Sequence, residues 1–331
     1  MDLTLLGRTG LAVSRIGLGL AALGRPGYIN LGHARDLARD YAVGAMQARM
    51  HAVLDAAWEA GVRYFDAARS YGRAEEFLAG WLAKHAIAPG DVTVGSKWGY
   101  TYTAAWRVDA QQHEVKEHSS ATLERQLAES RGWFGAELDL YQIHSATLES
   151  GVLDDRAVLE RLAHLRDGGL AIGLSLSGPR QAETLRRALD IRIGGAPVFD
   201  TVQATWNLLE RSAGAALQDA HRGGVGVIVK EALANGRLTD RNDAGAFAAR
   251  RRVLDEVAAG LGCRLDALAL AAVLAQPWVD VVLSGAATVA QLRSNLGALA
   301  VRWDDAAAAA LQPIVEEPQS YWATRRALPW N

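Results

Sequence analysis

The stretch GVRYFDAARSYG, residues 61–72, contains a short apolar run, Tyr64–Asp66, that ends in a carboxylate and leads into a turn. The segments on both sides of this stretch carry hydrophobic residues at helical spacing. The same alternation of apolar run and helical segment repeats along the chain. The eight runs are Arg15–Leu20, Tyr64–Asp66, Val92–Lys97, Leu138–His144, Ala171–Leu176, Thr201–Ala204, Gly226–Lys230 and Val281–Ser284. Short apolar strands that alternate with amphipathic helices predict a parallel sheet covered by helices.

Eight such units in 331 residues favour an α/β fold of the closed (β/α)₈ barrel type over an open doubly wound sheet. No low-complexity or Pro/Ser-rich linker divides the chain, so we predict one domain over residues 1–331. Residues 3–13 predict a β-hairpin with a Gly-bearing turn. The segments Leu23–Tyr41 and Tyr321–Asn331 fit neither strand nor helix, and we expect both to be long loops over the carboxyl-terminal face of the barrel.

Composition excludes several classes of protein. There are 35 basic and 37 acidic residues, and this balance argues against a nucleic-acid partner. The single cysteine, Cys263, rules out an internal disulfide and a two-cysteine zinc site. No apolar run reaches the ~20 residues of a membrane span, and the first residues lack the layout of a signal peptide. We therefore expect a soluble cytoplasmic protein, a monomer or small homo-oligomer, with no membrane partner.

The lysines are unusual because there are only four of them among the 35 basic residues. Lysine, unlike arginine, is a compact charge that can lose its proton. Lys84 and Lys116 lie in helical or polar stretches and are interpreted as surface charge. Lys97 and Lys230 each end an apolar run, so both are expected at the barrel mouth.

Four polar residues follow the carboxyl ends of three consecutive predicted strands: Asp66, Tyr71, Lys97 and His144. Active sites of β/α barrels lie at that end of the strands. Each residue also has an ordinary structural interpretation, as a turn former, a packing group or a solvated strand end. Their placement on one rim favours a catalytic group.

The four residue types suit proton transfer to a carbonyl oxygen. A free tyrosine has a pKa of ~10, which is too high for efficient proton transfer near neutral pH. A nearby ammonium such as Lys97 favours the phenolate and would lower the pKa of Tyr71. The Asp66 carboxylate would hold that ammonium in place, and His144 could hydrogen-bond the substrate carbonyl. Such a group could protonate the oxygen as hydride reaches the carbon.

Residues 61–72 resemble the aldo-keto reductase signature around that family's catalytic Asp and Tyr. The resemblance covers roughly residues 3–300. Within the family, the chain is similar to the branch that includes sugar dehydrogenases and potassium-channel beta subunits. The other segments that carry it are Lys97, Tyr141–His144, Leu6–Gly19 and Ser284–Gly297. It implies a barrel that holds NADP(H) across its mouth. It also implies that Tyr71 is the general acid and base and that Lys97, paired with Asp66, lowers the pKa of Tyr71. His144 would be the group that orients the carbonyl.

The resemblance also implies a set of cofactor contacts. Ser175 and Gln203 match positions that hold the nicotinamide carboxamide, and the segment from residue 285 to 295 matches the adenosine half. The residues expected to contact cofactor are Leu20, Asp66, Ser175, Gln203, Lys230, Glu231, Leu233, Asn235, Arg241, Gly285, Ala287, Gln291 and Asn295.

The chain departs from the family pattern beside the expected nicotinamide. Lys230 replaces the aromatic residue that stacks on the ring, Glu231 and Ala232 replace Ser-Pro, and Leu176 replaces a carboxamide-binding Asn. In one interpretation Lys230 only lays its aliphatic stem along the ring. In the other, its charge disfavours the cationic oxidised ring.

The sequence does not single out one residue that would bind a 2′-phosphate, because Ala287 stands where many relatives carry a basic residue. Arg241 aligns with another phosphate-contacting position and Arg251 lies further along. Either could bind phosphate, or both could be surface charge. NADP(H) is the expected cofactor and NAD(H) the second choice.

Three functions fit these residues. The first is an NADP(H)-dependent oxidoreductase that interconverts a carbonyl and an alcohol as small-molecule substrates. The second is an NADP(H)-binding sensor or regulatory subunit with little turnover. The third is a barrel hydrolase or aldolase that uses Lys97 or Lys230 as a Schiff-base amine. Aromatic residues that could wall the substrate pocket are Tyr28, Trp98, Tyr100, Trp106, Tyr321, Trp322 and Trp330.

Overall fold

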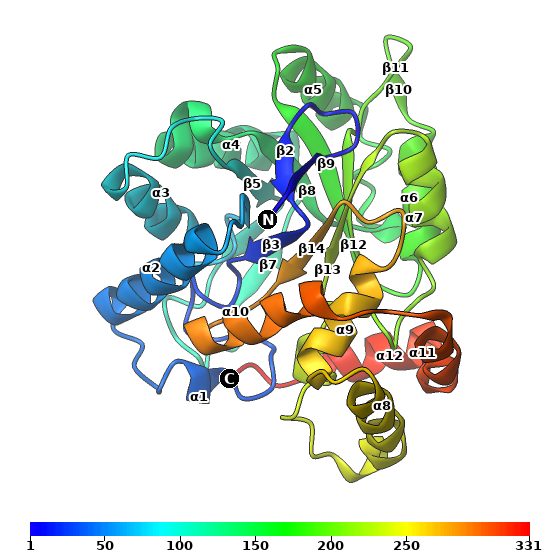
Figure 1. Ribbon diagram of the computed structural model, residues 1–331. Coiled ribbons are helices and arrows are strands. Elements are labelled where there is room, and N and C mark those ends of the chain that lie inside the picture. Colours follow the sequence, from blue (N-terminus) through cyan, green and yellow to red (C-terminus); the bar gives the residue numbers. More distant parts are fainter.

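A computed structural model describes all residues, 1–331, and its centre is a closed barrel of eight strands (Figure 1). The order around the barrel is β12-β13-β14-β3-β4-β5-β8-β9, and all neighbouring strands are parallel. The strands are β3 (Ile16–Gly19), β4 (Tyr64–Asp66), β5 (Thr93–Trp98), β8 (Leu140–Ala146), β9 (Ala171–Leu176), β12 (Thr201–Thr205), β13 (Gly226–Lys230) and β14 (Val281–Ser284). Each overlaps one of the eight runs, so the predicted (β/α)₈ barrel is confirmed. The bounds differ most at β8, which continues past His144 to Ala146.

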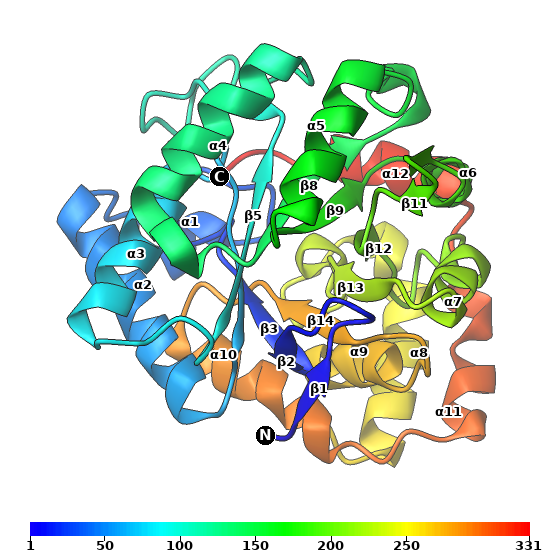
Figure 2. The ribbon, with the colours of Figure 1, turned by 90° about the horizontal axis from the view of Figure 1, so that it is seen from above.

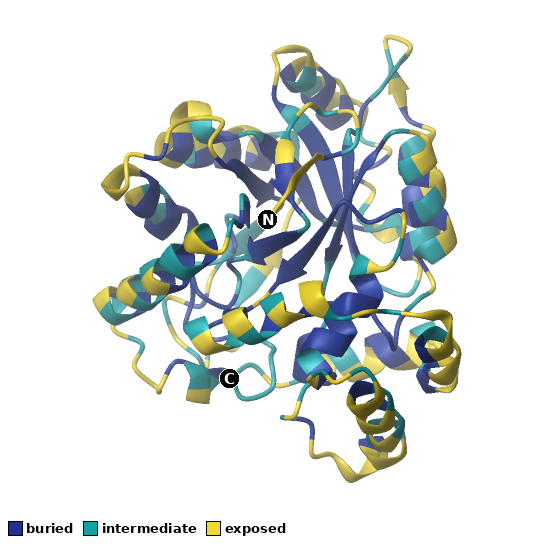
Figure 3. Cartoon of the chain, in the orientation of Figure 1, coloured by how far each residue is buried: buried dark blue, intermediate teal, exposed yellow.

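Helices form a ring around the barrel, which the view from above shows (Figure 2). They are α2 (Val43–Glu59), α3 (Ala74–Lys84), α4 (Ser120–Phe134), α5 (Arg156–Asp167), α6 (Gln181–Leu189), α7 (Gly214–Arg222), α8 (Ala248–Gly260), α9 (Leu265–Leu274) and α10 (Val289–Leu296). The strands are buried on both faces, whereas the outer faces of most helices are exposed (Figure 3). This burial explains why the strands are nearly continuous apolar runs instead of alternating ones.

The predicted amino-terminal hairpin is present as β1 (Leu3–Leu5) and β2 (Ala12–Ser14), paired antiparallel. Its turn fits closely against the start of β13, because a Cβ on Gly7 would lie 2.3 Å from the backbone nitrogen of Gly226. Gly7 has φ +52°, a conformation that glycine adopts without steric cost. Two further antiparallel hairpins were not predicted, β6 (Tyr100–Tyr102) with β7 (Glu114–Lys116), and β10 (Arg192–Ile193) with β11 (Ala196–Pro197).

The segment Leu23–Tyr41 is mostly irregular, as expected, with one short helix, α1 (His33–Asp36). The prediction of a loop for Tyr321–Asn331 is wrong in part, because helix α12 (Pro318–Arg326) includes its first six residues. After α11 (Asp305–Ala310), α12 buries Tyr321 and Trp322 in a second apolar cluster, which stabilises the helix. The last residues then return to α1, and Figures 1 and 2 both place the carboxyl terminus beside that helix.

No single helix combines the length and apolar character needed to cross a membrane. One pair of segments, residues 245–260 and 265–274, reaches the threshold only when the two are taken together, and they meet at a bend of 79°.

Candidate active site

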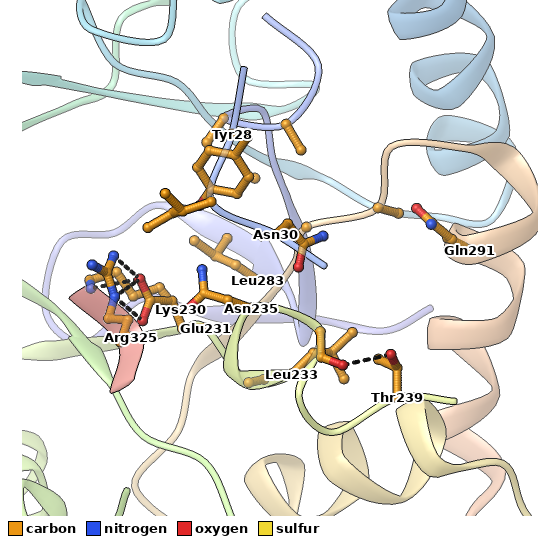
Figure 4. Close-up of a pocket in the computed structure, with 18 of the residues that line it drawn as sticks. Tyr28, Asn30, Lys230, Glu231, Leu233, Asn235, Thr239, Leu283, Gln291 and Arg325 are labelled. Carbon is orange, nitrogen blue, oxygen red and sulfur yellow. Dashed lines mark hydrogen bonds and ion pairs between the residues drawn. The ribbon is translucent and has the colours of Figure 1, made fainter. Parts of the chain in front are cut away.

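A cavity of about 770 Å³ opens among the carboxyl ends of the strands and the loops that follow them (Figure 4). Its volume lies in the range of ~300–1,000 Å³ that is typical of small-molecule sites. It brings together residues from β4, β8, β12, β13 and α10. The predicted site residues that line it are Asp66, Tyr71, His144, Gln203, Lys230, Glu231, Leu233, Asn235, Arg241, Gly285, Gln291 and Asn295.

Asp66 and Lys97 form a buried ion pair at the bottom of the cavity. Lys97 Nζ donates hydrogen bonds to Asp66 Oδ1 and, at 3.0 Å, to the carbonyl oxygen of Ala67. The other oxygen, Asp66 Oδ2, accepts from Gln203 Nε2 at 2.7 Å and from the Tyr64 hydroxyl at 3.1 Å. Lys97 is fully buried and Asp66 is 1% exposed, so the carboxylate and the ammonium compensate each other away from water.

Tyr71 lies against this pair, with its hydroxyl oxygen 3.5 Å from Lys97 Nζ. Burial raises the pKa of Tyr71 well above its usual value, and the Asp66 carboxylate raises it further. The cation that lowers the pKa is Arg25, whose Cζ lies 5.4 Å from the centre of the Tyr71 ring. The net direction of the shift leaves Tyr71 a phenol at neutral pH. The role of Lys97 in lowering this pKa stays a prediction.

His144 faces Tyr71 across the cavity. Their ring centres are 5.5 Å apart in an edge-to-face arrangement, and Tyr100 contacts the imidazole from another side at 4.9 Å. Burial lowers the pKa of His144 well below its usual value, with the Lys97 charge acting in the same direction. The imidazole is therefore neutral at physiological pH and keeps one N–H donor. The following residue, Ser145, has φ +53°, a strained conformation of the kind found at functional sites.

Three of the predicted cofactor residues do not line the cavity: Leu20, Ser175 and Ala287. Leu20 is fully buried in the core. The Ser175 hydroxyl accepts a 2.8 Å hydrogen bond from the Ser145 backbone N–H, and Ser177, two residues further, lines the cavity. Ala287 donates its backbone N–H to Gln291 Oε1 at 2.8 Å. These three residues support the walls of the cavity in this structure.

Lys230 ends β13 and Glu231 follows it at one side of the cavity, opposite Gln291 (Figure 4). Lys230 Nζ donates to the Thr205 hydroxyl at 2.9 Å and lies 3.8 Å from Glu231. Arg325 of α12 binds the Glu231 carboxylate through Nε at 3.0 Å and also through Nη2. This arginine, together with Lys230, lowers the pKa of Glu231 to about 2, against the effect of burial. Glu231 has φ +56°, so its position costs conformational energy.

The other side of the cavity has the donors and acceptors that the adenosine half of a dinucleotide requires. Asn235 Oδ1 and Ser294 Oγ are buried polar atoms with no hydrogen-bond partner. The amino-terminal turn of α10 lies there as well, with Ala290 and Gln291 on the cavity wall. Free N–H groups at a helix start suit phosphate oxygens. The residues present therefore fit a nucleotide, and buried orphaned atoms are satisfied by such a ligand.

The candidate phosphate contacts differ in position. Arg241 lines the cavity, but both of its terminal nitrogens bind the Asp36 carboxylate, and Nη1 also donates to the carbonyl oxygen of Leu31 at 3.0 Å. Arg251 does not line the cavity, but it binds Asp240, which does, at 3.0 Å. Of the two arginines, only Arg241 lines the cavity.

Three of the seven aromatic residues expected to wall a substrate pocket do so: Tyr28, Tyr100 and Trp330. Trp98, Trp106, Tyr321 and Trp322 lie outside the lining, so that part of the prediction is wrong. The physical reason is packing, because Trp98, Tyr321 and Trp322 are buried in the interior. Trp106 donates its indole N–H to the carbonyl oxygen of Tyr41 and packs between loops.

Arg25 and Glu114 are cavity residues that the sequence analysis missed. Arg25 Nη1 donates to Glu114 Oε2 at 2.8 Å and to the carbonyl oxygen of Ser70 at 2.9 Å. Its guanidinium lies over three aromatic rings, those of Tyr28, Tyr71 and Trp330. Arg25 is one of 31 arginines and Glu114 lies on an unpredicted hairpin, so no spacing in the sequence distinguished either.

The comparisons with known proteins agree with this fold. The model of the Aldo/keto reductase family matches residues 15–316. The chain is 26% identical to aldo-keto reductase str7 of Strobilurus tenacellus, covering 93% of this chain and 90% of that protein. It is 23% identical to the uncharacterized oxidoreductase YqkF of Bacillus subtilis, covering 90% of each.

A solved structure with the same fold is aldo-keto reductase AKR11C1 from Bacillus halodurans in its holo form. It aligns with a TM-score of 0.72 at 21% identity, over 96% of this chain and 97% of that chain. A match of the family model over nearly the whole chain, from the first barrel strand to beyond the last, assigns the family directly. The chain belongs to the aldo/keto reductase family, whose members are oxidoreductases that act on carbonyls.

Proposed function

We propose that this protein is an NADP(H)-dependent oxidoreductase that interconverts an aldehyde or ketone and the corresponding alcohol. The observation that carries the proposal is the constellation at the cavity bottom. There a protonated phenol, Tyr71, lies 3.5 Å from the ammonium of Lys97 and beside the neutral imidazole of His144. These groups are the donors that a carbonyl oxygen needs when hydride reaches its carbon.

Each group has a distinct role. Tyr71 donates its proton to the carbonyl oxygen in reduction and accepts the hydroxyl proton in oxidation. Lys97 stabilises the phenolate that forms when the proton leaves, while Asp66 holds the ammonium at that place. His144 donates an N–H to the substrate oxygen and fixes its orientation. The bound cofactor supplies or accepts the hydride at the carbonyl carbon.

The cofactor would extend from the cavity bottom to α10. Gln203 lies beside Asp66 at the nicotinamide end, with Ser175 behind the wall. At the adenosine end the residues proposed to hold the nucleotide are Leu233, Asn235, Gly285, Gln291 and Asn295. The preference for NADP(H) over NAD(H) depends on Arg241, which would exchange Asp36 for the 2′-phosphate.

The test follows the absorbance of NADPH and of NADH with a panel of aldehydes and ketones, in both directions of reaction. We expect turnover with wild-type protein and its loss in Tyr71→Phe, which keeps the ring and removes only the hydroxyl. A Tyr71→Phe variant that turns over at the wild-type rate would refute the proposed role of this tyrosine.

The second function, a cofactor-binding sensor with little turnover, is distinguished by the same assay. Tight binding of NADPH without turnover of any carbonyl in the panel would favour it. The single domain over residues 1–331, the cytoplasmic location and the state as a monomer or small homo-oligomer stay predictions. Limited proteolysis, fractionation of cells and light scattering test them in turn.

A further inference from the structure

We propose that Lys230 makes this site bind the reduced nicotinamide cofactor in preference to the oxidised one. The inference rests on the proposed function and concerns the residue where this chain departs from its family. Lys230 ends β13 in the cavity that holds Asp66, Tyr71 and His144. Its side chain is only 16% exposed, and its amine donates to the Thr205 hydroxyl on the neighbouring strand.

The charges around the cavity bottom leave Lys230 uncompensated. Asp66 pairs with Lys97, and Glu114 pairs with Arg25. Glu231 is the carboxylate nearest to Lys230, at 3.8 Å, but Arg325 already binds it through two nitrogens.

The other groups that face Lys230 carry no net formal charge. Thr205 of β12 is neutral, Asp66 of β4 and Lys97 of β5 cancel, and Glu231 cancels Arg325 of α12. The Trp322 ring, with its centre 5.9 Å from Nζ, adds no formal charge. Tyr71 and His144 are neutral, as argued above. One net positive charge therefore remains on this wall, and Lys230 carries it.

The two redox forms of the cofactor differ by one charge in the ring that this wall would face. The oxidised nicotinamide ring is a cation, whereas the reduced ring is neutral. Charges interact more strongly in a cavity with little water than in bulk solvent. Lys230 therefore repels the oxidised form and leaves the reduced form unaffected, which favours loading with reduced cofactor and release of the oxidised product during carbonyl reduction.

The preference should depend on pH. Burial, opposed by Glu231 and Asp66 and assisted by Arg325 and Lys97, lowers the pKa of Lys230 to about 8. Because the amine is charged below this pKa and neutral above it, the preference is present at pH 6.5 and fades by pH 9.5. By linkage, binding of the oxidised cofactor, unlike the reduced one, should release a proton near pH 7.5.

The experiment measures the dissociation constants of NADPH and NADP⁺ by quenching of tryptophan fluorescence, at pH 6.5 and 9.5. Wild type is compared with Lys230→Met, which removes the charge and keeps the length, and with Lys230→Arg, which keeps the charge. Lys84→Met, on the exposed face of α3, is the matched control for loss of a lysine. We expect Lys230→Met to shift the ratio of the two constants about tenfold toward the oxidised form at pH 6.5, which equals about 1.4 kcal/mol.

The outcomes separate the two proposals. If neither NADPH nor NADP⁺ binds wild-type protein, and NADH and NAD⁺ fail as well, the proposed function falls and this inference falls with it. If either pair binds but its ratio is the same in wild type and Lys230→Met, only the inference is overturned. If Lys230→Met fails to fold, wild-type protein alone still tests the inference. A ratio of the NADPH and NADP⁺ dissociation constants that is the same at pH 6.5 and 9.5 would refute the role of the amine.

Discussion

The floor and the rim of the cavity are built in different ways. The floor consists of Asp66, Lys97 and His144, which lie at or near the carboxyl ends of β4, β5 and β8, together with Gln203 in the middle of β12. Its contacts run across the barrel as well as between neighbouring strands, because Gln203 donates to Asp66 on the opposite side. The rim consists of residues 23–41, the β6–β7 hairpin and residues 327–331.

The rim joins segments from opposite ends of the chain. Asn331 Nδ2 donates to the Asn30 carbonyl oxygen at 2.9 Å, and Asn331 Oδ1 accepts from the Ala34 N–H at 3.2 Å. Tyr28 and Asn331 also exchange two backbone hydrogen bonds, of 3.1 and 3.2 Å. Trp330 stacks on His113 of the loop within the β6–β7 hairpin, with ring centres 3.9 Å apart.

This difference separates chemistry from selectivity. The floor holds buried charges whose removal leaves a partner unpaired away from water, so changes there should be costly. The rim holds hydrogen bonds and ring contacts that are partly exposed, and each contributes about 1 kcal/mol. Substitutions in the floor should therefore affect turnover and folding, and substitutions in the rim should affect affinity.

The largest effect is expected for Tyr71→Phe, at the boundary between floor and cavity. Loss of the proton donor should lower kcat by about 10²–10⁴-fold, the usual contribution of general acid catalysis. The dissociation constant of NADPH should change less than about twofold. Stopped-flow rates and fluorescence titration measure the two quantities, and a parallel loss of cofactor affinity would show that the hydroxyl supports the cofactor site instead of acting only as the proton donor.

Asp66→Asn should affect folding, because it leaves the buried ammonium of Lys97 without its counter-charge. The expected loss is about 3–5 kcal/mol of unfolding free energy, measured in urea. Asp66→Asn combined with Lys97→Met removes both charges and should be more stable than Asp66→Asn alone. If the two single losses simply add in the double variant, the pair is not coupled.

Trp330→Ala tests the rim. The change removes the ring that stacks on His113 and that lies 4.8 Å from the Arg25 guanidinium. We expect KM for the carbonyl substrate to rise about tenfold, in keeping with one cation–π and one stacking contact, while kcat changes less than about twofold. Trp133→Ala, on the exposed surface of α4, is the control. A fall in kcat with unchanged KM would mean that Trp330 influences the residues of the floor and not the binding of the carbonyl substrate.

The smallest effect is expected for Asp36→Asn, at the adenosine end of the rim. Asp36 binds Arg241, so its neutralisation should free the guanidinium and tighten NADPH binding by about two- to fivefold, which is less than the contribution of one charge-assisted hydrogen bond. Binding of NADH, which lacks the 2′-phosphate, should be unchanged. An equal gain for both cofactors would show that Arg241 does not contact that phosphate.

Asp66, Lys97 and His144 of the floor could be predicted from the chain because each lies at or near the carboxyl end of a strand, whereas Gln203, in the middle of β12, was expected only from the resemblance to the family. A run such as residues 64–66 or 92–97 places its last side chain at the barrel mouth, and parallel strands put all such ends on one face. The resemblance to the family then assigned the roles. The rim was predicted only in part: its two long loops and Trp330 were expected near the mouth, whereas Arg25 and Glu114 gave no signal because they lie outside the barrel strands.

The sequence by itself determined the eight strands, the barrel and the four residues that meet at its mouth, because strand period and strand ends are local properties of the chain. Only the tertiary structure decided the states of these groups. It neutralises Lys97 with Asp66, raises the pKa of Tyr71 by burial and assigns Glu231 to Arg325, which leaves the charge of Lys230 uncompensated. Protonation and net charge depend on what lies within a few ångströms in space, and segments as distant as β4 and α12 supply those neighbours.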